Sequence, residues 1–358
     1  MKSYPVYLLD LDDTLIGSFE HVSTVIYPKL ADSLGLPAPD KESVRKHWGK
    51  ELSLSLSEIF KIEPDEGTID LLSQLHLENP TPPISGSKRI LETLKKHGRF
   101  VGLYTAAHPK IMDQCLENTL QIKRDYFDAV FNTYEQGIPK PAKEIIDFFS
   151  RSFFEKTGKR VKGSEILIVG DSLTDFFLSK IYPTDFCAVL NGAHSKKDFV
   201  DNGLDTQFIF PSISEALTAP TDHGIVAIVK NEKNEFLLIK EGRENNPYFG
   251  HWSGPHGRCQ AEDILEEETV IRETLEECGV LVKPVRKLYT RPADTKIKTV
   301  SFWEAVLQDQ SSSSFTLSEE VSEIGWIHLE NIKNGTIPLY PGTLDFFDQY
   351  ENLIPTIF

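Results

Sequence analysis

The sequence predicts an α/β doubly wound parallel sheet with an inserted helical cap, followed by an α+β domain. Apolar runs at residues 6–9, 100–104 and 166–169 are continuous rather than alternating, which is typical of parallel strands buried on both faces. Helical patterns lie between these runs, and that alternation indicates a layered α/β architecture. Residues from about 17 to 84 interrupt it with mostly helical patterning, which predicts the cap.

The chain is long enough for two domains of about 100–200 residues each. It has 358 residues, and its segment 217–223 is small, polar and contains a proline. Such a composition is typical of a linker. We therefore expect one domain over 1–218 and another over 219–358.

The second domain shows a different pattern from the first. Residues 225–229 and 236–239 flank a short turn and predict a β-hairpin. A charged helix is expected over 265–278, and another strand over 299–306. One acidic helix among several strands predicts the α+β class.

The charge balance is acidic, with 54 Asp and Glu residues against 38 Lys and Arg residues and a formal net charge of −16. A nucleic-acid backbone is bound by a basic surface, so we expect no long nucleic acid as a partner. Small phosphorylated or diphosphate substrates are compatible with this charge if metal ions supply the positive charge. The sequence leaves the oligomeric state open.

Cysteine usage and hydropathy predict a cytoplasmic protein. The four cysteines have no paired spacing, which disfavours structural zinc and a disulfide framework. No uncharged apolar run reaches the roughly 18 residues of a membrane span. The first residues lack the long apolar stretch and small-residue cleavage site of a signal peptide.

Two carboxylates follow the first predicted strand. Asp10 and Asp12 lie two residues apart at its end, so both can face one site while Leu11 points away. A carboxylate can attack phosphorus and form an acyl phosphate if a divalent cation reduces the repulsion and a second group donates a proton. An acidic turn without function is the alternative at this point.

Three later features also follow strands or lie on loops. Thr105 ends the strand at 100–104, Lys140 stands between prolines, and Asp171 and Asp175 follow the strand at 166–169. Each has a structural alternative: a helix N-cap, a solvated lysine, or turn and cap residues. Together and in this order they indicate one site, because parallel strands end at the same edge of a sheet.

With these residues the chain resembles the haloacid dehalogenase superfamily, whose four motifs match in order over about residues 5–215. The resemblance implies that Asp10 is the nucleophile. Asp12 would protonate the leaving oxygen and then activate water. Thr105 and Lys140 would hold the phosphoryl oxygens.

The same resemblance implies a magnesium site and narrows the reaction. Asp10, Asp171 and the backbone carbonyl of Asp12 would bind Mg²⁺, and Asp175 would support Lys140 or the metal. Superfamily dehalogenases lack the second aspartate and ion-pumping ATPases have threonine there, so a phosphatase or a phosphomutase is favoured. The insert over about 17–84 is that of the helical-cap subgroup, in which it excludes water and selects the substrate.

Three glutamates share one face of the helix expected over 265–278. Glu273, Glu276 and Glu277 are spaced i, i+3 and i+4, a placement that costs a few tenths of a kcal/mol per like-charged pair. Their oxygens suit Mg²⁺ or Mn²⁺. We expect Ile271 and Leu275 to anchor the opposite, apolar side, and Gly279 to end the helix. A solvated acidic face is the alternative.

Together with Gly257, this helix resembles the Nudix box and implies a Nudix fold for the second domain. The right half of the box is matched by Arg272, Glu273, Glu276, Glu277 and Gly279. By resemblance, Arg272 orients the helix through a salt bridge, and the glutamates hold metals that polarise a diphosphate and its attacking water.

The left half of the box departs from the pattern. Five residues separate Gly257 from Asp263, where the box has glutamate, and eight residues rather than seven separate Asp263 from Arg272. Either Glu262 takes the bracing role or the usual brace to Arg272 is lost. An additional base outside the box is a further expectation, for which Glu304, Glu319 and Glu320 are the candidates.

For the whole chain we expect a bifunctional hydrolase. The second domain would cleave a nucleoside diphosphate linked to another group, and the first would hydrolyse a phosphate monoester, with a nucleotide-like substrate as the specific guess. Two alternatives stay open: a degenerate Nudix domain that senses a ligand and regulates the phosphatase, and a phosphomutase activity of the first domain.

Overall fold

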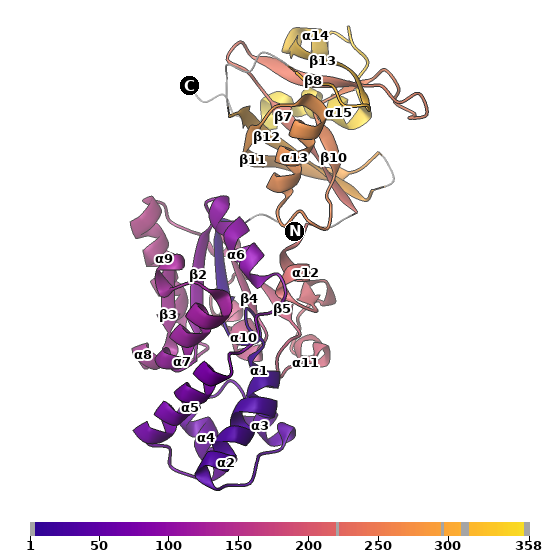
Figure 1. The fold of residues 1–358 in the computed structure, drawn as a ribbon. Coiled ribbons are helices and arrows are strands. Elements are labelled where there is room, and N and C mark those ends of the chain that lie inside the picture. Colours follow the sequence, from indigo (N-terminus) through magenta and orange to yellow (C-terminus); the bar gives the residue numbers. More distant parts are fainter. Residues whose placement is uncertain (1–3, 220–221, 295–296, 309–314, 354–358) are drawn as a thin grey trace. The chain divides into compact units, whose positions relative to one another are not determined.

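The computed structural model describes residues 4–219, 222–294, 297–308 and 315–353. The chain divides into two compact units between Leu217 and Thr218, and each is described by itself (Figure 1). All four cysteines lie in the described part, are buried and form no disulfide. In that part, no helix is long and apolar enough to cross a membrane.

The N-terminal unit is built on a parallel sheet with strand order β3-β2-β1-β4-β5-β6, which confirms the predicted α/β class. In the strand pairs, Asp10 lies beside Tyr104 and Leu9 beside Val169, so β1, β2 and β4 all end at the same edge of the sheet. The strands are β1 (Val6–Asp10), β2 (Phe100–Thr105), β3 (Ala129–Asn132), β4 (Ile166–Gly170), β5 (Asp185–Val189) and β6 (Ile209–Phe210).

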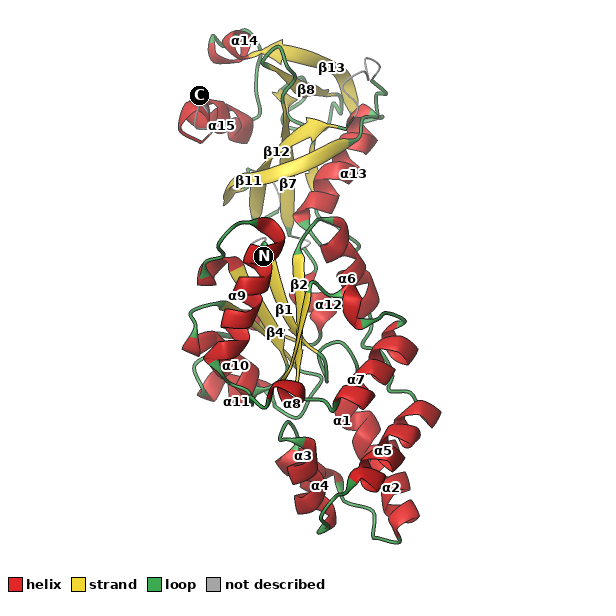
Figure 2. Cartoon of the chain, turned by 90° about the vertical axis from the view of Figure 1, so that its left-hand side faces the viewer, coloured by secondary structure: helices red, strands yellow, loops and turns green. Residues whose placement is uncertain are grey.

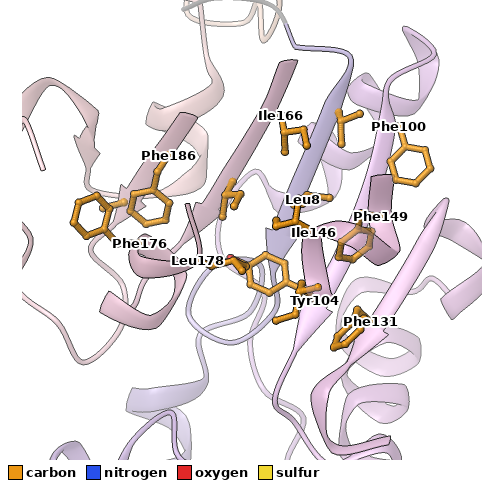
Figure 3. Close-up of a cluster of buried hydrophobic side chains, with 14 of the residues drawn as sticks. Leu8, Phe100, Tyr104, Phe131, Ile146, Phe149, Ile166, Phe176, Leu178 and Phe186 are labelled. Atoms are coloured by element: carbon orange, nitrogen blue, oxygen red, sulfur yellow. The ribbon is translucent and has the colours of Figure 1, made fainter. Parts of the chain in front are cut away.

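Helices cover both faces of this sheet (Figure 2). They are α6 (Ser87–Lys96), α7 (Pro109–Gln114), α8 (Thr133–Gln136), α9 (Lys143–Thr157), α10 (Leu173–Ile181), α11 (Lys196–Asp201) and α12 (Ile213–Leu217). Side chains from α9 and α10 pack with strand residues such as Leu8 and Phe186 in one buried cluster (Figure 3). In this cluster, Phe149 of α9 lies on the side of the sheet that β2 and β3 form, near Phe131. This core fixes the strand ends from which the candidate site is built.

Helices also fill the chain between β1 and α6, where the cap is expected. They are α1 (Ser18–His21), the π-helix η1 (Val22–Ile26), α2 (Tyr27–Leu34), α3 (Lys41–His47), α4 (Leu52–Phe60) and α5 (Glu66–Glu78). These cap helices extend beyond the end of the sheet at which β1 and β2 finish (Figure 1). Their two connections to the sheet pair with each other at Ile16 and Pro83. Tyr27 and Phe60 meet edge to face in the small core of the cap, with ring centroids 5.3 Å apart.

The C-terminal unit contains two small sheets, with strand orders β10-β7-β12-β11 and β13-β8-β9. Its strands are β7 (His223–Val229), β8 (Glu235–Glu241), β9 (Trp252–Ser253), β10 (His256–Arg258), β11 (Val282–Pro292), β12 (Thr299–Leu307) and β13 (Val321–His328). Its helices are α13 (Glu266–Cys278), α14 (Leu329–Lys333) and α15 (Pro341–Leu353). The mixed four-stranded sheet and the antiparallel three-stranded sheet confirm the α+β class, and α14 and α15 add to the one expected helix.

The strands predicted at residues 225–229 and 236–239 and the turn between them are confirmed, but their pairing as a β-hairpin is wrong beyond the turn. β7 pairs with β10 and β12, whereas β8 pairs with β9 and β13 in the other sheet. The two segments are joined at the turn by the antiparallel bridge between Lys230 and Phe236 and by the hydrogen bond from Asn231 N to the Glu235 carbonyl at 3.0 Å. Both strands are buried, and such strands carry no alternation that would reveal which neighbour each one takes.

Glu266 fastens the first turn of α13 to the larger sheet. Its carboxylate accepts hydrogen bonds from Lys287 Nζ of β11 at 2.5 Å and from Trp303 Nε1 of β12 at 2.8 Å, and His223 of β7 lies 3.5 Å away. Burial alone would raise the pKa of Glu266, but His223 and Lys287 outweigh burial and lower this pKa to about 2.

Replacing Glu266 with glutamine is expected to lower the free energy of unfolding of the C-terminal unit by about 1.5–3 kcal/mol at neutral pH. Because the pKa of the folded state lies below the ordinary value of 4.5, the contribution is complete above about pH 4.5 and is lost as the pH falls toward 2. Urea unfolding of the unchanged chain and of Glu266→Gln between pH 2 and pH 7 measures this difference in the free energy of unfolding. Exposed Glu262→Gln is the control, and a difference that does not change with pH would contradict the assignment.

Candidate active sites

Asp10 and Lys140 form a buried ion pair at the end of the parallel sheet. Lys140, from the loop between α8 and α9, donates from Nζ to Asp10 Oδ1 at 2.5 Å and to Asp175 Oδ1 at 3.1 Å. The three side chains are only 9%, 6% and 0% exposed, in the order Lys140, Asp10, Asp175. Burial raises the pKa of Asp10 to about 7, although Lys140 opposes this. Lys140 is therefore a partner of two carboxylates and not a solvated charge.

Asp171 completes a group of carboxylates whose chemistry fits a divalent cation. One oxygen each of Asp10, Asp171 and Asp175 lies within 4.8 Å of the others. Burial raises the pKa of Asp171 well above its ordinary value, and the charges of Asp13 and Asp10 add to the effect. Lys140 alone cannot balance these buried acids, and carboxylate oxygens are the ligands that Mg²⁺ prefers. The donor set therefore fits magnesium.

Asp175 is oriented by its own helix. It is the third residue of α10, and its Oδ2 accepts hydrogen bonds from the backbone N of Ser172 at 3.1 Å and from its Oγ at 2.6 Å. This capping box leaves Oδ1 to Lys140. Asp175 was expected to support either Lys140 or the metal. In the structure it contacts Lys140 and also lies close to Asp10 and Asp171.

Asp12 and Thr105 lie at the same sheet edge. Asp12 Oδ1 accepts a hydrogen bond from Ser18 Oγ at 2.5 Å, and Asp12 lines a cavity beneath the cap. Thr105 Oγ1 accepts a hydrogen bond from the backbone N of Ala107 at 3.0 Å, whereas the N-cap of α7 is His108. Thr105 therefore closes a turn after β2 instead of capping a helix.

Asp13 is a site residue that the sequence reasoning missed. It has a left-handed backbone with φ 58° and is fully buried. Its carboxylate accepts hydrogen bonds from the backbone N of Phe19 at 2.8 Å and from Trp48 Nε1 at 2.9 Å. Trp48 follows α3, so Asp13 ties the cap to the sheet edge. A third acid in the turn was visible in the sequence, but its partner lies 35 residues away.

Gly192 was also missed, and it leaves room for Asp171. A Cβ at position 192 would lie 1.8 Å from Asp171 Oδ2 and 3.1 Å from the Cβ of Asp13. Only a glycine fits beside these carboxylates without moving one of them. No sequence pattern marks this position, because it lies on the loop after β5.

Gly192→Ala is expected to displace Asp171 and weaken magnesium binding without removing any carboxylate. We expect phosphate release at limiting Mg²⁺ to fall by about 10–100-fold, with partial recovery when Mg²⁺ is raised. The magnesium dependence of monoester hydrolysis measures this. Gly67→Ala in α5 is the matched control, since its new Cβ would meet nothing closer than 3.5 Å. An unchanged magnesium dependence in Gly192→Ala would contradict the role of Asp171.

In the C-terminal unit, Arg272 is braced by Asp263. Arg272 Nη2 donates to Asp263 Oδ2 at 2.8 Å and to the carbonyl of Arg258 at 3.0 Å. Glu262, the other candidate for this role, is exposed. The salt bridge to Arg272 is therefore present, although Asp263 is shorter than glutamate and one residue is inserted before Arg272. Arg272 Nη1 also donates to Glu273 Oε1 at 2.6 Å and to Glu276 Oε2 at 3.2 Å.

The three glutamates of α13 differ in their surroundings. Glu273 and Glu277 are buried, whereas the Glu276 side chain is 55% exposed. Glu277 accepts a hydrogen bond from the backbone N of His256 at 2.7 Å. Burial raises the pKa of Glu273 to about 7 and that of Glu277 well above its ordinary value. A Cβ at Gly257 would lie 1.9 Å from the Glu273 carboxyl carbon, so this glycine makes room for that carboxylate.

The three glutamates do not converge as the aspartates do. Among the described residues, the acidic group whose ligand atoms all lie within 4.8 Å of one another is Asp10, Asp171 and Asp175. Glu273 and Glu276 are instead tied to Arg272. Their oxygens suit a divalent cation chemically, but binding one requires Arg272 to release at least part of this pairing.

The expected apolar anchor of α13 is wrong. Leu275 is 46% exposed and Ile271 is partly exposed, whereas Val270 and Cys278 are buried in the core between the helix and the sheet. Thr274, which follows Glu273, is buried on the same side, and its Oγ1 donates to the carbonyl of Val270 at 2.7 Å. The packed side of the helix is therefore the side that also carries Glu273 and Glu277. Gly279 ends the helix with φ 72°, as predicted.

The candidates for an additional base can now be compared. Glu304 is paired with Arg286 at 2.6 Å, and Glu319 and Glu320 are both exposed. Glu320 accepts a hydrogen bond from Arg243 Nη1 at 2.7 Å, and its charge contributes to the raised pKa of Glu277. Glu320 is thus the candidate that lies electrostatically close to the box.

Comparison with known proteins matches each unit to a family. The family described as haloacid dehalogenase-like hydrolase matches residues 7–189, about half of the chain, and the NUDIX domain matches residues 220–349. The comparison with curated proteins found no match.

Three solved structures are similar to parts of the chain. A haloacid dehalogenase-like hydrolase from Bacteroides fragilis is 21% identical over 60% of this chain and 99% of its own, with a TM-score of 0.48. A predicted phosphoglycolate phosphatase from Haemophilus somnus is 18% identical over 59% and 96%, with a TM-score of 0.48. A MutT protein from Methanosarcina mazei is 28% identical over 36% and 92%, with a TM-score of 0.31.

Proposed function

Because the chain belongs to the haloacid dehalogenase-like hydrolase family and also carries a NUDIX domain, we propose that it is a bifunctional hydrolase. The N-terminal unit would hydrolyse phosphate monoesters through an aspartyl phosphate on Asp10. The C-terminal unit would cleave a nucleoside diphosphate linked to another group. Both products of that cleavage are phosphate monoesters, so the reaction of the C-terminal unit can supply the substrate of the N-terminal unit.

The observation that carries the phosphatase proposal is the buried cluster of Asp10, Lys140 and Asp171 at the sheet edge. Lys140 holds Asp10 at the end of β1 and offers an ammonium to the phosphoryl oxygens. Asp12 lines the cavity in which the leaving group would lie, and burial raises its pKa, as a proton donor requires. Thr105 ends the neighbouring strand and would contact the same phosphoryl group.

Magnesium would be held by Asp10, Asp171 and the backbone carbonyl of Asp12. When bound, it would supply the positive charge that lets an anionic carboxylate approach an anionic phosphate. Asp175 would keep Lys140 in place, and Trp48 with the other cap residues would limit the access of water.

The diphosphate proposal rests on Glu273 and Glu277, which are buried beside Gly257 and His256. With Glu276 they would hold Mg²⁺ or Mn²⁺, while Arg272 stays braced by Asp263. Glu320 is our candidate for the base that activates water, because it lies close enough to raise the pKa of Glu277.

One observation favours a second function for this unit. Arg272 pairs with Glu273 and with Glu276, so a positive side chain partly takes the place of a cation on the acidic face. A unit that keeps this pairing would bind a diphosphate without cleaving it and regulate the phosphatase.

The test uses the full chain with magnesium and a panel of nucleoside diphosphate sugars, dinucleotides and phosphate monoesters. Diphosphate cleavage and monoester hydrolysis that both stop on chelation and return with Mg²⁺ support the bifunctional hydrolase. Absent diphosphate cleavage with a phosphatase rate that responds to diphosphates would establish the regulatory function. Little free phosphate and a requirement for a bisphosphate activator would point to a phosphomutase.

A further inference from the structure

A small cavity lies between the cap and the end of the sheet, next to Asp12. Its volume is about 120 Å³. Asp12 and the segment 106–108 border it from the sheet side, and α2, α4 and α5 border it from the cap. Most of its wall is apolar, made by side chains such as Tyr27, Leu52 and Leu72. A leaving group bound at Asp12 must occupy this space.

The charges around the cavity are balanced on the cap side. Lys50 lines the cavity, and its Nζ lies 2.7 Å from Glu58 Oε2. His47, which also lines the cavity, contacts the same carboxylate. The cavity therefore offers no unpaired ammonium or guanidinium from its described lining residues to an anionic leaving group.

His76 is one of two histidines of this wall, with the less buried His108, whose Nδ1 has no hydrogen bond in the described structure. It belongs to α5, is 7% exposed and lines the cavity, and its Nδ1 has no hydrogen bond in the described structure. An unpaired polar atom in such a buried position costs roughly 1–3 kcal/mol, so a polar group of a ligand that reaches this nitrogen would remove the cost. Burial lowers the pKa of His76 to about 4, and the neutral ring can both donate and accept a hydrogen bond.

Size further limits the leaving group. The cavity is smaller than the roughly 150 Å³ cavity that accommodates benzene in an engineered protein core. The base and the ribose of a nucleoside are each close to benzene in size, so one such ring nearly fills the space and a complete nucleoside extends out of its open side. The non-nucleoside product of a cleaved diphosphate can be much smaller.

Resting on the proposed phosphatase function, we propose that this unit hydrolyses the phosphate ester of a small, uncharged alcohol, and that His76 binds a polar group of that alcohol. In the reaction, the ester P–O bond breaks as a bond forms between Asp10 and phosphorus, and Asp12 gives its proton to the departing alcohol. Water then takes the place of Asp10 on phosphorus and returns a proton to Asp12. Together with the diphosphate cleavage, this assigns the non-nucleoside half of the diphosphate to the phosphatase.

The first test compares kcat/KM for glycerol 3-phosphate and ribose 5-phosphate with that for nucleoside 5′-monophosphates and phosphoglycolate. The expected result is a preference of at least about tenfold for the uncharged polyol esters over the other two classes. A preference for nucleotides or for the anionic phosphoglycolate would overturn the proposal. Phenyl phosphate distinguishes a wrong substrate class from a wrong function. If the chain does not hydrolyse phenyl phosphate in a reaction that depends on Asp10, the proposed phosphatase function itself is refuted.

The second test changes His76 alone. His76→Leu is expected to lower kcat/KM for the preferred polyol ester by about three- to tenfold, while phenyl phosphate, which has no further polar group, is hydrolysed as before. His76→Gln keeps a neutral donor and acceptor and should restore part of the loss. Leu77→Ala, on the exposed side of the same helix, is the control. Equal effects of His76→Leu on both esters, or no effect on either, would show that His76 contacts only water or its neighbours.

Discussion

Asp10→Asn is expected to abolish monoester hydrolysis, lowering kcat by at least about a thousandfold, because an amide cannot attack phosphorus as a carboxylate does. The substitution keeps the shape of a side chain that is only 6% exposed and lies against Lys140. It leaves Lys140 paired with Asp175 and removes one of several buried negative charges, so the fold should tolerate it. Steady-state phosphate release with magnesium measures the effect.

The control for this result is the other reaction of the same protein. Diphosphate cleavage by Asp10→Asn should stay within about twofold of the unchanged chain, since Asp10 belongs to a different compact unit from α13. Loss of both activities would contradict two separate sites. Retained phosphate release from monoesters would remove Asp10 from the reaction.

Glu276→Gln is expected to lower diphosphate cleavage by about a hundredfold or more, while monoester hydrolysis continues. Glutamine keeps the length of the side chain but is a poorer ligand for a divalent cation. Because the Glu276 side chain is 55% exposed, the loss cannot be explained by unfolding. Product analysis on a cleavable diphosphate measures the effect, and Glu262→Gln, also exposed and outside the helix, is the control.

The outcome for Glu276→Gln also decides between the two functions proposed for the C-terminal unit. A chain that cleaves diphosphates only when Glu276 is present uses the box catalytically. A chain that cleaves none, yet changes its phosphatase rate when diphosphates bind, uses it as a sensor in which Arg272 continues to neutralise the acidic face.

The layered architecture could be predicted from the sequence because buried parallel strands are continuous apolar runs. The N-terminal site could be located for the same reason, since Asp10, Thr105 and Asp171 each end or follow such a run and the parallel sheet brings those ends together. Lys140 was harder, because it comes from a loop, and only its place in the order of motifs indicated it.

Contacts between distant residues were beyond the sequence. Asp13 meets Trp48 across 35 residues, and Gly192 matters only because Asp171 lies against it. The same limit explains the wrong apolar side of α13. A helical pattern shows which residues share a face, but Leu275 and Val270 are both aliphatic, and only the sheet decides which of them is covered.

Asp263 contacts Arg272 although the spacing of the motif around it is irregular. Counting residues left the brace of Arg272 open, because the acid is shorter and one residue is inserted. In the structure, Thr269 Oγ1 donates to Asp263 Oδ2 at 2.9 Å and Arg272 donates to the same oxygen at 2.8 Å. The loop places the shorter side chain close enough, which no spacing rule describes.

The central claim, an aspartyl phosphate on Asp10, is tested most directly by trapping it. Asp12→Asn removes the group that would activate water, and p-nitrophenyl phosphate has a leaving group that needs no proton, so the intermediate should accumulate in this variant with magnesium. Borohydride reduces an acyl phosphate to an alcohol and would convert residue 10 to homoserine, which peptide mass spectrometry detects. We predict homoserine at position 10 and an unreduced residue in Asp10→Asn. No reduction at position 10, or reduction at another carboxylate, would contradict the account.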